Sequence, residues 1–180
     1  MKRALVLLSL SAQGAILAAC SEDPTRGGKA PPATETRSAT TRSAIPQEIH
    51  ERASRSPVPV LAPAVSLERV TLVVDQGFYA LNGVVNATLP DGRGSRATIT
   101  VQGTRIVHVR EAPGDVSTHA MRGGRGLYTV NEGIVTTTWI EGGTSYSVDV
   151  ECSEAGDPRC QDEAFVIELT DRLAPVGGAR

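Results

Sequence analysis

The sequence predicts an α+β fold, an antiparallel, curved β-sheet meander with one C-terminal helix packed on one face. Short runs rich in β-branched residues recur between Val58 and Pro175, and turn dipeptides such as Asn82-Gly83 and Asp91-Gly92 separate them. A segment with apolar residues at helical spacing follows the last of these runs. Several short strands with turn signals at close intervals imply an antiparallel meander.

The first part of the predicted sheet consists of short strands joined by close turns. The run from Val70 to Val74 predicts one strand. Asn82-Gly83 is expected to turn the chain between strands over 78–81 and 84–89, and Asp91-Gly92 marks the next turn. Further strands are expected at Ala97 to Val101, Arg105 to Arg110, and Leu127 to Val130.

The sequence predicts the strand register of a hairpin from Gly133 to Glu151. If Gly142-Gly143 forms a two-residue loop, Trp139 lies opposite Tyr146, Thr137 opposite Val148, and Val135 opposite Val150. Successive side chains then point to opposite faces, and a slip of one residue would mix the two sets. The apolar face carries Val135, Trp139, Tyr146, Val148 and Val150, and the polar face carries Thr136, Thr138, Ser145, Ser147 and Asp149.

The predicted helix follows this hairpin directly. Asp157 is expected to be its N-cap and Pro158 its first residue, because proline suits the first helical position. Pro175 and Gly177-Gly178 are expected to end it. Its apolar side, at helical spacing, consists of Phe165, Val166, Leu169 and Leu173.

The N-terminus has the pattern of an export signal. Lys2 and Arg3 precede an apolar segment from Ala4 to about Leu17, and Leu17-Ala18-Ala19-Cys20 follows. This motif resembles the lipobox of bacterial lipoproteins, which implies that 1–19 is a cleaved signal and that acylated Cys20 becomes the mature N-terminus. Ser21 in place of an aspartate then favours the outer membrane if the organism has one. An ordinary signal peptide remains an alternative, whereas a membrane anchor needs about 20 apolar residues without such polar interruptions.

Acylation of Cys20 would leave Cys152 and Cys160 as the remaining pair. An oxidising compartment favours a disulfide between them, and Cys152 continues the apolar parity of its strand. The bond would then clip the inner face of the last strand to the first turn of the helix. The alternative, half of a metal site, lacks the number of ligands that zinc needs.

Composition divides the remaining chain into a tether and one domain. Residues 20–57 contain almost no large apolar side chains, so we expect a disordered tether with a reach of roughly 35 Å. A short helix over 46–52 is possible, but we do not expect it to pack. Residues 58–175 are expected to form a single β-rich domain, and 176–180 a flexible C-terminus.

A second resemblance covers about Gly133 to Leu173. The Trp-x-x-Gly-Gly-x-x-Tyr-x-Val hairpin and the helix after it resemble the end of small extracytoplasmic bacterial domains that look like lipoprotein carriers and RseB-like half-barrels. The known carriers are larger and enclose a lipid-binding cavity. A cavity not filled by Trp139, Phe165 and Leu169 would therefore indicate a lipid or hydrophobic-peptide binder, and a filled core a protein-interaction role.

The sequence contains few motifs that are typical of catalysis or of cofactor and metal binding. The sequence has no nucleophile elbow, phosphate loop, zinc-protease motif or calcium loop, so no catalytic residue, cofactor or metal is expected. The net charge of −2 moves to about −4 once the signal is removed, which gives no indication of nucleic-acid binding. The acidic side chains between Asp149 and Glu163 raise the possibility of calcium, with a solvated loop as the alternative.

A small basic face is a candidate anion site. A three-residue loop at 102–104 would leave Arg96, His108 and Arg110 outward, whereas a two-residue loop would turn His108 inward. We favour the outward register because it separates apolar from charged side chains. A solvated strand face is the alternative interpretation.

Three functional classes remain. The leading one is a non-enzymatic, membrane-anchored envelope lipoprotein that binds an envelope protein or a small ligand. The alternative is a structural or accessory component of an envelope complex. The third is a hydrolytic enzyme with His108 or His119 as general base near a carboxylate, for which the sequence offers no diagnostic spacing.

Overall fold

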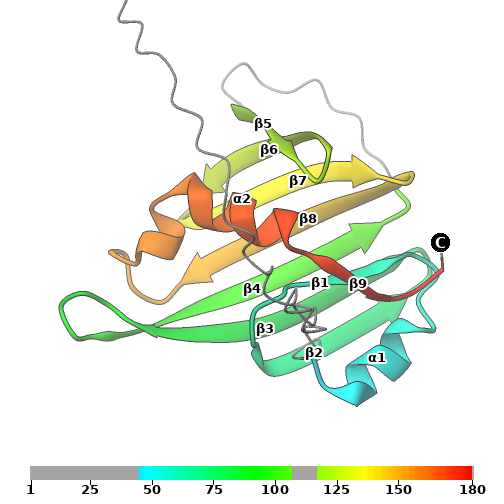
Figure 1. The fold of residues 1–180 in the computed structure, drawn as a ribbon, viewed down its shortest axis with the longest axis horizontal. Helices are drawn as coiled ribbons and strands as arrows, with labels where there is room; N and C mark the ends of the chain where they lie inside the picture. Colours follow the sequence, from blue (N-terminus) through cyan, green and yellow to red (C-terminus); the bar gives the residue numbers. More distant parts are fainter. Residues whose placement is uncertain (1–44, 107–116, 180) are drawn as a thin grey trace, which may run out of the picture. The chain divides into compact units, whose positions relative to one another are not determined.

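A seven-stranded antiparallel sheet forms most of the structure (Figure 1). The computed structural model describes residues 45–106 and 117–179. The large sheet comprises β2 (Glu68–Asp75), β3 (Phe78–Thr88), β4 (Gly94–Thr104), β5 (Ser117–Met121), β6 (Gly124–Asn131), β7 (Ile134–Glu141) and β8 (Thr144–Cys152). The other elements are a two-stranded sheet of β1 (Val60–Ala62) and β9 (Ala174–Gly177), the helices α1 (Gln47–Ala53) and α2 (Glu163–Asp171), and the 3-10 helix η1 (Pro158–Cys160). The prediction of a mainly antiparallel sheet with a C-terminal helix is confirmed.

The sheet is open and combines two meanders. Its strand order is β2-β3-β4-β8-β7-β6-β5, so β2 and β5 form the two edges. The first meander is β2-β3-β4 and the second is β5-β6-β7-β8, and the pairing of β4 with β8 joins them. After β4 the chain therefore enters the sheet again at its opposite edge (Figure 1). The predicted single meander is correct within each half of the sheet and wrong at this crossover.

The hairpin of β7 and β8 has the predicted register. Trp139 lies opposite Tyr146, Thr137 opposite Val148, and Val135 opposite Val150. Gly142 and Gly143 form the turn with φ values of 58° and 76°, as a type I′ turn requires. All five residues of the predicted apolar face are buried, so the assignment of the two faces is confirmed.

Two glycines that we expected in turns lie inside long strands. β3 runs through Asn82-Gly83 and β4 runs through Gln102 to Thr104, so both predicted turns are wrong. A Cβ on Gly83 would lie 2.8 Å from Leu67, and a Cβ on Gly103 would lie 2.3 Å from the ring of Tyr79. These glycines therefore allow other groups to approach the strands closely, which is the second common role of glycine in a sheet.

A row of aromatic side chains and glycines crosses the buried face of the sheet. Tyr79 on β3 lies opposite Gly103 on β4, which lies opposite Tyr146 on β8. Tyr146 in turn pairs with Trp139 on β7, and their rings stack 5.2 Å apart. Trp139 lies opposite Gly126 on β6, where a Cβ would come within 2.2 Å of the Met121 sulfur. Glycine thus provides the room that the large side chains occupy.

The two tyrosine hydroxyls hold β1 over this row. The hydroxyl of Tyr79 accepts a hydrogen bond of 3.0 Å from the Leu61 N–H, and the hydroxyl of Tyr146 donates one of 3.2 Å to the Pro59 carbonyl. Burial raises the pKa of Tyr79 well above its ordinary value, so this hydroxyl stays protonated. β1 therefore covers the apolar face between the two tyrosines.

The C-terminal helix begins later than predicted. Asp157 caps only the 3-10 helix η1, in which Pro158 is the first residue. α2 begins at Glu163, where the Asp162 carboxylate accepts a hydrogen bond from the Ala164 N–H. α2 contacts β7 and β8, and its Thr170 hydroxyl lies 2.7 Å from the hydroxyl of Thr137. The helix is thus shorter than the apolar pattern indicates, and Leu173 is buried beyond its end.

The short helix within the predicted tether packs, so our expectation about it is wrong. α1 buries Ile49 and Ala53 in the hydrophobic core. His50 Nδ1 lies 3.2 Å from the Val176 carbonyl, and the Arg52 guanidinium donates to the Leu72 carbonyl. The apolar pair at helical spacing outweighs the polar composition around it. The tether prediction therefore fails for the residues from 45 onward.

The predicted flexible C-terminus is also wrong for 176–179. Val176 and Gly177 belong to β9, which pairs antiparallel with β1. The Ala179 N–H donates to the Ser56 carbonyl at 2.9 Å. We expected Pro175 and the glycines only to end a helix, whereas in an edge strand a proline needs no partner for its missing N–H.

Gly103→Ala is expected to lower the free energy of unfolding by about 1–3 kcal/mol, because the added methyl group would have to displace the buried ring of Tyr79. Urea denaturation measures this change. Gly94→Ala is the matched control on the same strand, where a Cβ meets nothing within 4 Å. Equal stabilities of the two variants would contradict the close packing of the aromatic row.

Candidate functional site

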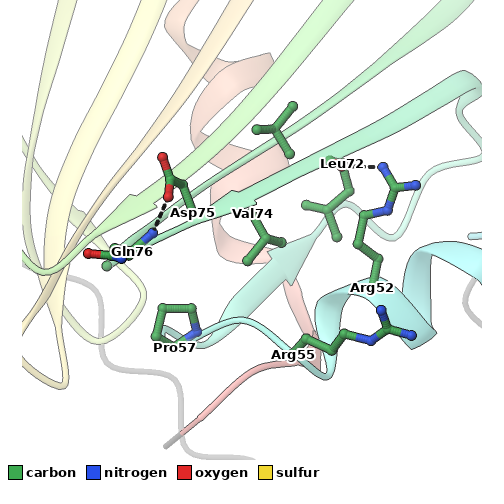
Figure 2. Close-up of a pocket in the computed structure, with 9 residues that line it drawn as sticks. Arg52, Arg55, Pro57, Leu72, Val74, Asp75 and Gln76 are labelled. Atoms are coloured by element: carbon green, nitrogen blue, oxygen red, sulfur yellow. Dashed lines mark hydrogen bonds between the residues drawn. The ribbon is translucent and has the colours of Figure 1, made fainter.

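A groove of about 850 Å³ runs between α1 and the edge strand β2 (Figure 2). Arg52, Arg55 and Pro57 form one wall. The other wall is β2 from Leu72 to Asp75, and the turn Gln76-Gly77 closes one end. The packing of α1 against β2 and β9 thus creates the groove.

The wall formed by β2 exposes main-chain groups. Among residues 45–106 and 117–179, β2 is the last strand on its side of the sheet and pairs only with β3. The Leu72 carbonyl accepts a hydrogen bond of 3.0 Å from Arg52 Nη1, so it points away from β3. Because alternate residues of a strand direct their N–H and C=O groups to the same side, those of Val74 also point into the groove. The groove can therefore offer both donors and acceptors to an extended chain.

The groove is lined mainly by apolar side chains on β2, and by Arg52 of α1 and Arg55 of the segment after it. Val73 is 56% exposed, a high value for a large apolar side chain. Arg52 and Arg55 are exposed, and within the described ranges neither forms an ion pair with a carboxylate. Asp75 lies by the turn, where its carboxylate accepts a hydrogen bond from the Gln76 N–H. No sequence pattern indicates this site, because it depends on how α1 packs.

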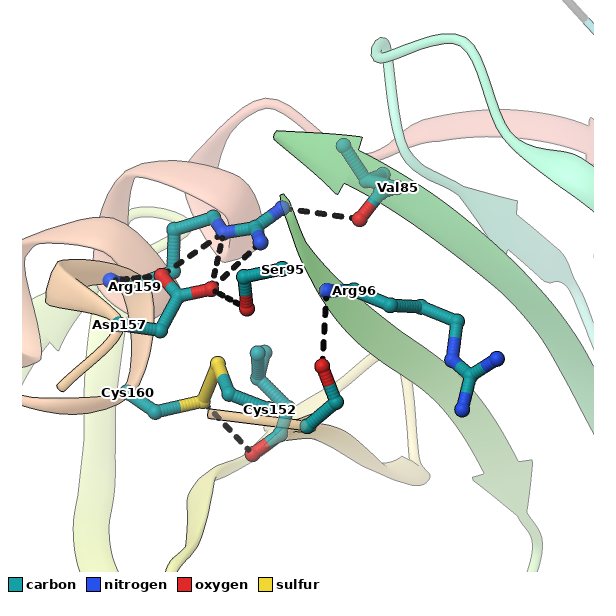
Figure 3. Close-up of polar contacts among 9 residues, drawn as sticks. Val85, Ser95, Arg96, Cys152, Asp157, Arg159 and Cys160 are labelled. Atoms are coloured by element: carbon teal, nitrogen blue, oxygen red, sulfur yellow. Dashed lines mark hydrogen bonds and ion pairs between the residues drawn. A yellow bond between two sulfur atoms is a disulfide. The ribbon is translucent and has the colours of Figure 1, made fainter. Parts of the chain in front are cut away.

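The disulfide between Cys152 and Cys160 is present, as predicted (Figure 3). It joins the end of β8 to η1. Beside it the buried Asp157 carboxylate pairs with Arg159 and accepts a hydrogen bond of 2.6 Å from the Ser95 hydroxyl. No sequence pattern indicated this ion pair. Together with Ser95 it forms a polar network that reinforces the disulfide.

The electrostatics of Asp157 follow from these partners. The hydrogen bonds from the Arg159 side chain hold the pKa of Asp157 well below its ordinary value, and the Ser95 hydroxyl adds to this effect, while burial opposes it. Arg159 also donates to the Val85 carbonyl at 2.9 Å. The pair thus ties η1 to β3 and β4, and its role is structural.

The predicted anion-binding face is described only at Arg96. This residue is exposed, and its side chain points away from the polar cluster (Figure 3). His108 and Arg110 lie outside the described residues. The hairpin that we expected to place them beside Arg96 is not formed, because β4 pairs with β3 on one side and with β8 on the other.

His119, the second candidate general base, lies in β5. Its Nε2 is buried and lies 3.3 Å from Glu163 Oε2 without the geometry of a hydrogen bond. Its ring forms a T-shaped pair with the ring of Tyr128, whose pKa is raised by desolvation and then by Glu163 and Asp162. The structure thus brings His119 to a carboxylate, but His119 lines neither the groove beside β2 nor the crevice beside Phe165 and Leu169.

The acidic residues that suggested calcium are dispersed. Asp149 accepts hydrogen bonds from Thr136 and Gln102, and Asp162 caps α2. Over residues 45–106 and 117–179, no group of three or more acidic, histidine or cysteine side chains is placed to hold a metal ion. Asp149 and Asp162 thus have local hydrogen-bond partners instead.

The buried face of the sheet is filled by side chains. Trp139 and Tyr146 are each 3% exposed and stack on one another. Leu169 is buried and Phe165 half-buried, and the crevice that they line with Val65 measures only about 190 Å³. Trp139 and Leu169 therefore occupy space that a cavity on this face would need.

No family model, curated protein or solved structure matches the chain. The helices in the described part of the chain all lack the length and hydropathy of a membrane span. The groove and its chemistry are therefore the basis for a functional assignment.

Acidification is expected to remove the contribution of Asp157 to stability. The depressed pKa keeps this carboxylate ionised in the folded protein after the unfolded chain has begun to bind a proton. The stabilisation is therefore complete above the unfolded pKa and is lost as the pH falls. Urea denaturation should show a decreasing free energy of unfolding from about pH 5 to about pH 2.

The variant Asp157→Asn tests the origin of this dependence. It should lower the free energy of unfolding at neutral pH by about 2 kcal/mol and flatten the acid dependence, because Arg159 loses its partner. Asp91→Asn is the control, since Asp91 and Arg93 pair in a turn with side chains 51% and 60% exposed. An acid dependence unchanged in Asp157→Asn would contradict the assignment.

Proposed function

We propose that the protein is a lipid-anchored envelope module that binds another polypeptide in the groove between α1 and β2. The groove carries this proposal, because it joins an unpaired strand edge to an exposed apolar side chain and two arginines. An unpaired edge is a common docking element for extended polypeptides. Binding here requires no catalytic group.

The filled inner face supports a protein ligand over a lipid. We further infer that α2 covers this face of the sheet, since Val166 and Leu169 are buried and Thr170 contacts Thr137. A lipid would have to displace the aromatic row, whereas a polypeptide can bind at the edge without disturbing the core.

The lipobox-like sequence supports the anchored location. Acylation of Cys20 would place the chain at a membrane surface, in the outer membrane if the organism has one. Residues 20–44 would then act as a spacer before α1, because their composition disfavours a packed core. The spacer would let the groove reach partners beyond the lipid headgroups.

Cys20→Ser is expected to release the protein from the membrane fraction and to abolish incorporation of an alkynyl palmitate analogue. The reason is that the thiol of Cys20 is the proposed site of acylation. Fractionation and in-gel fluorescence measure both effects. The Cys152–Cys160 disulfide should persist in the variant, as tested by thiol alkylation without reductant. Unchanged membrane association and labelling would contradict the anchor.

A photo-crosslinking amino acid at position 73 is expected to form adducts with another polypeptide in intact cells, because Val73 lies exposed in the groove. Immunoblotting detects the adducts as bands of higher mass. The matched control is position 140, since Ile140 is also exposed (57%) but lies on β7, away from this edge. Equal labelling from both positions, or none from position 73, would refute the groove as the binding site.

A further inference from the structure

We propose that the occupant of the groove is an extended, acidic polypeptide segment that adds a strand to β2 and pairs its carboxylates with Arg52 and Arg55. This inference rests on the proposed function and specifies the chemistry of the partner. Three features support it: the main-chain groups of β2 that point into the groove, the hydrogen bond from Arg52 that a strand N–H can replace, and the positive charge of Arg52 and Arg55.

The usable edge of β2 is short and well defined. From Thr71 to Asp75 the strand pairs in register with β3. The register shifts between Glu68 and Thr71, where Arg69 has a positive φ of 53°, and the turn Gln76-Gly77 ends the strand. Such an irregularity limits further pairing on that side. An added strand would therefore bond to the outward groups of Leu72 and Val74.

Arg52 covers this edge in the free protein. Its guanidinium donates to the Leu72 carbonyl, the same acceptor that the N–H of an added strand would use. When a strand N–H takes over this carbonyl, the guanidinium is released within the groove. A carboxylate on the incoming strand can then accept the hydrogen bonds of Arg52, and charge-assisted bonds are stronger than the bond to a neutral carbonyl.

Arg55 adds a second positive charge to the wall of the groove that contains Arg52. It lines the groove on the same wall as Arg52 and Pro57 (Figure 2). A second copy of the chain would bring its own Arg52 and Arg55 to the same edge, and like charges repel. At the other end of the groove, beside the turn Gln76-Gly77, the negative charge of Asp75 would repel a carboxylate of the added strand. Acidic side chains at the α1 end of the added strand therefore fit the groove best.

The first experiment measures peptide binding to the full-length protein in detergent by fluorescence anisotropy. The probe is a labelled peptide of alternating valine and threonine that ends in two glutamates. We expect it to bind about tenfold more tightly than the same peptide ending in two lysines. Two further peptides carry N-methyl groups on one or the other alternate set of main-chain nitrogens. The peptide whose methylated nitrogens face β2 should not bind, because it lacks the donors that the strand edge requires.

The second experiment exchanges the charge of the groove. Arg55→Glu should weaken binding of the glutamate peptide about tenfold and favour the lysine peptide. We choose Arg55 because Arg52 also contacts β2 in the free protein. Arg125→Glu is the control, as Arg125 is an exposed arginine on β6 whose guanidinium contacts Thr118. Circular dichroism verifies that both variants are folded.

The outcomes separate this inference from the proposed function. Equal affinity for the glutamate and lysine peptides, no effect of Arg55→Glu, or full binding of both N-methylated peptides would each overturn the inference. If position 73 still crosslinks to a partner in cells, the groove remains the binding site. An adduct that proves to be a dimer of this chain would overturn the acidic occupant. Absence of both the adduct and peptide binding would overturn both proposals.

Discussion

The structure depends on the row of aromatic residues and glycines across its central strands. Tyr79, Gly103 and Tyr146 occupy adjacent positions on β3, β4 and β8, and so lie on both sides of the β4–β8 pairing that unites the two meanders. The tyrosine rings fill the space that Gly103 leaves, and Trp139 stacks on Tyr146 and extends the row onto β7. A register shift at β4 would place side chains where these rings lie, so the row fixes the alignment of the sheet.

The groove follows from this core through a chain of contacts. The hydroxyls of Tyr79 and Tyr146 hold β1, and β1 pairs with β9. The carbonyl of Val176 in β9 contacts His50 of α1, and α1 provides the arginine wall of the groove. The site is thus built on residues distant in the sequence. Its shape is nevertheless determined by packing, because α1 is held to both β2 and β9.

Local interactions explain what the sequence could predict. The β7–β8 hairpin is encoded by its turn and by the alternation of nearby residues, and both parts of that information are short-range. The disulfide followed from the cysteine count together with the assumed acylation of Cys20. The β4–β8 pairing and the β1–β9 pairing bring together distant segments, and neither periodicity nor turn chemistry specifies such partners. Gly83 and Gly103 were misread because close approach and a turn both favour glycine.

The edge at β2 shows how the same residues can protect a strand and select its partner. A free edge is at risk of pairing with any extended chain, including a second copy of itself. Here α1 stands beside the edge, Arg52 occupies an acceptor of β2, and two like charges oppose self-association. None of these features fills the groove, and the arginine contact can be exchanged for a strand hydrogen bond. Because the edge is protected by positive charge, a strand with negative charge overcomes this protection most easily. An acidic strand is therefore the occupant that this edge accepts best.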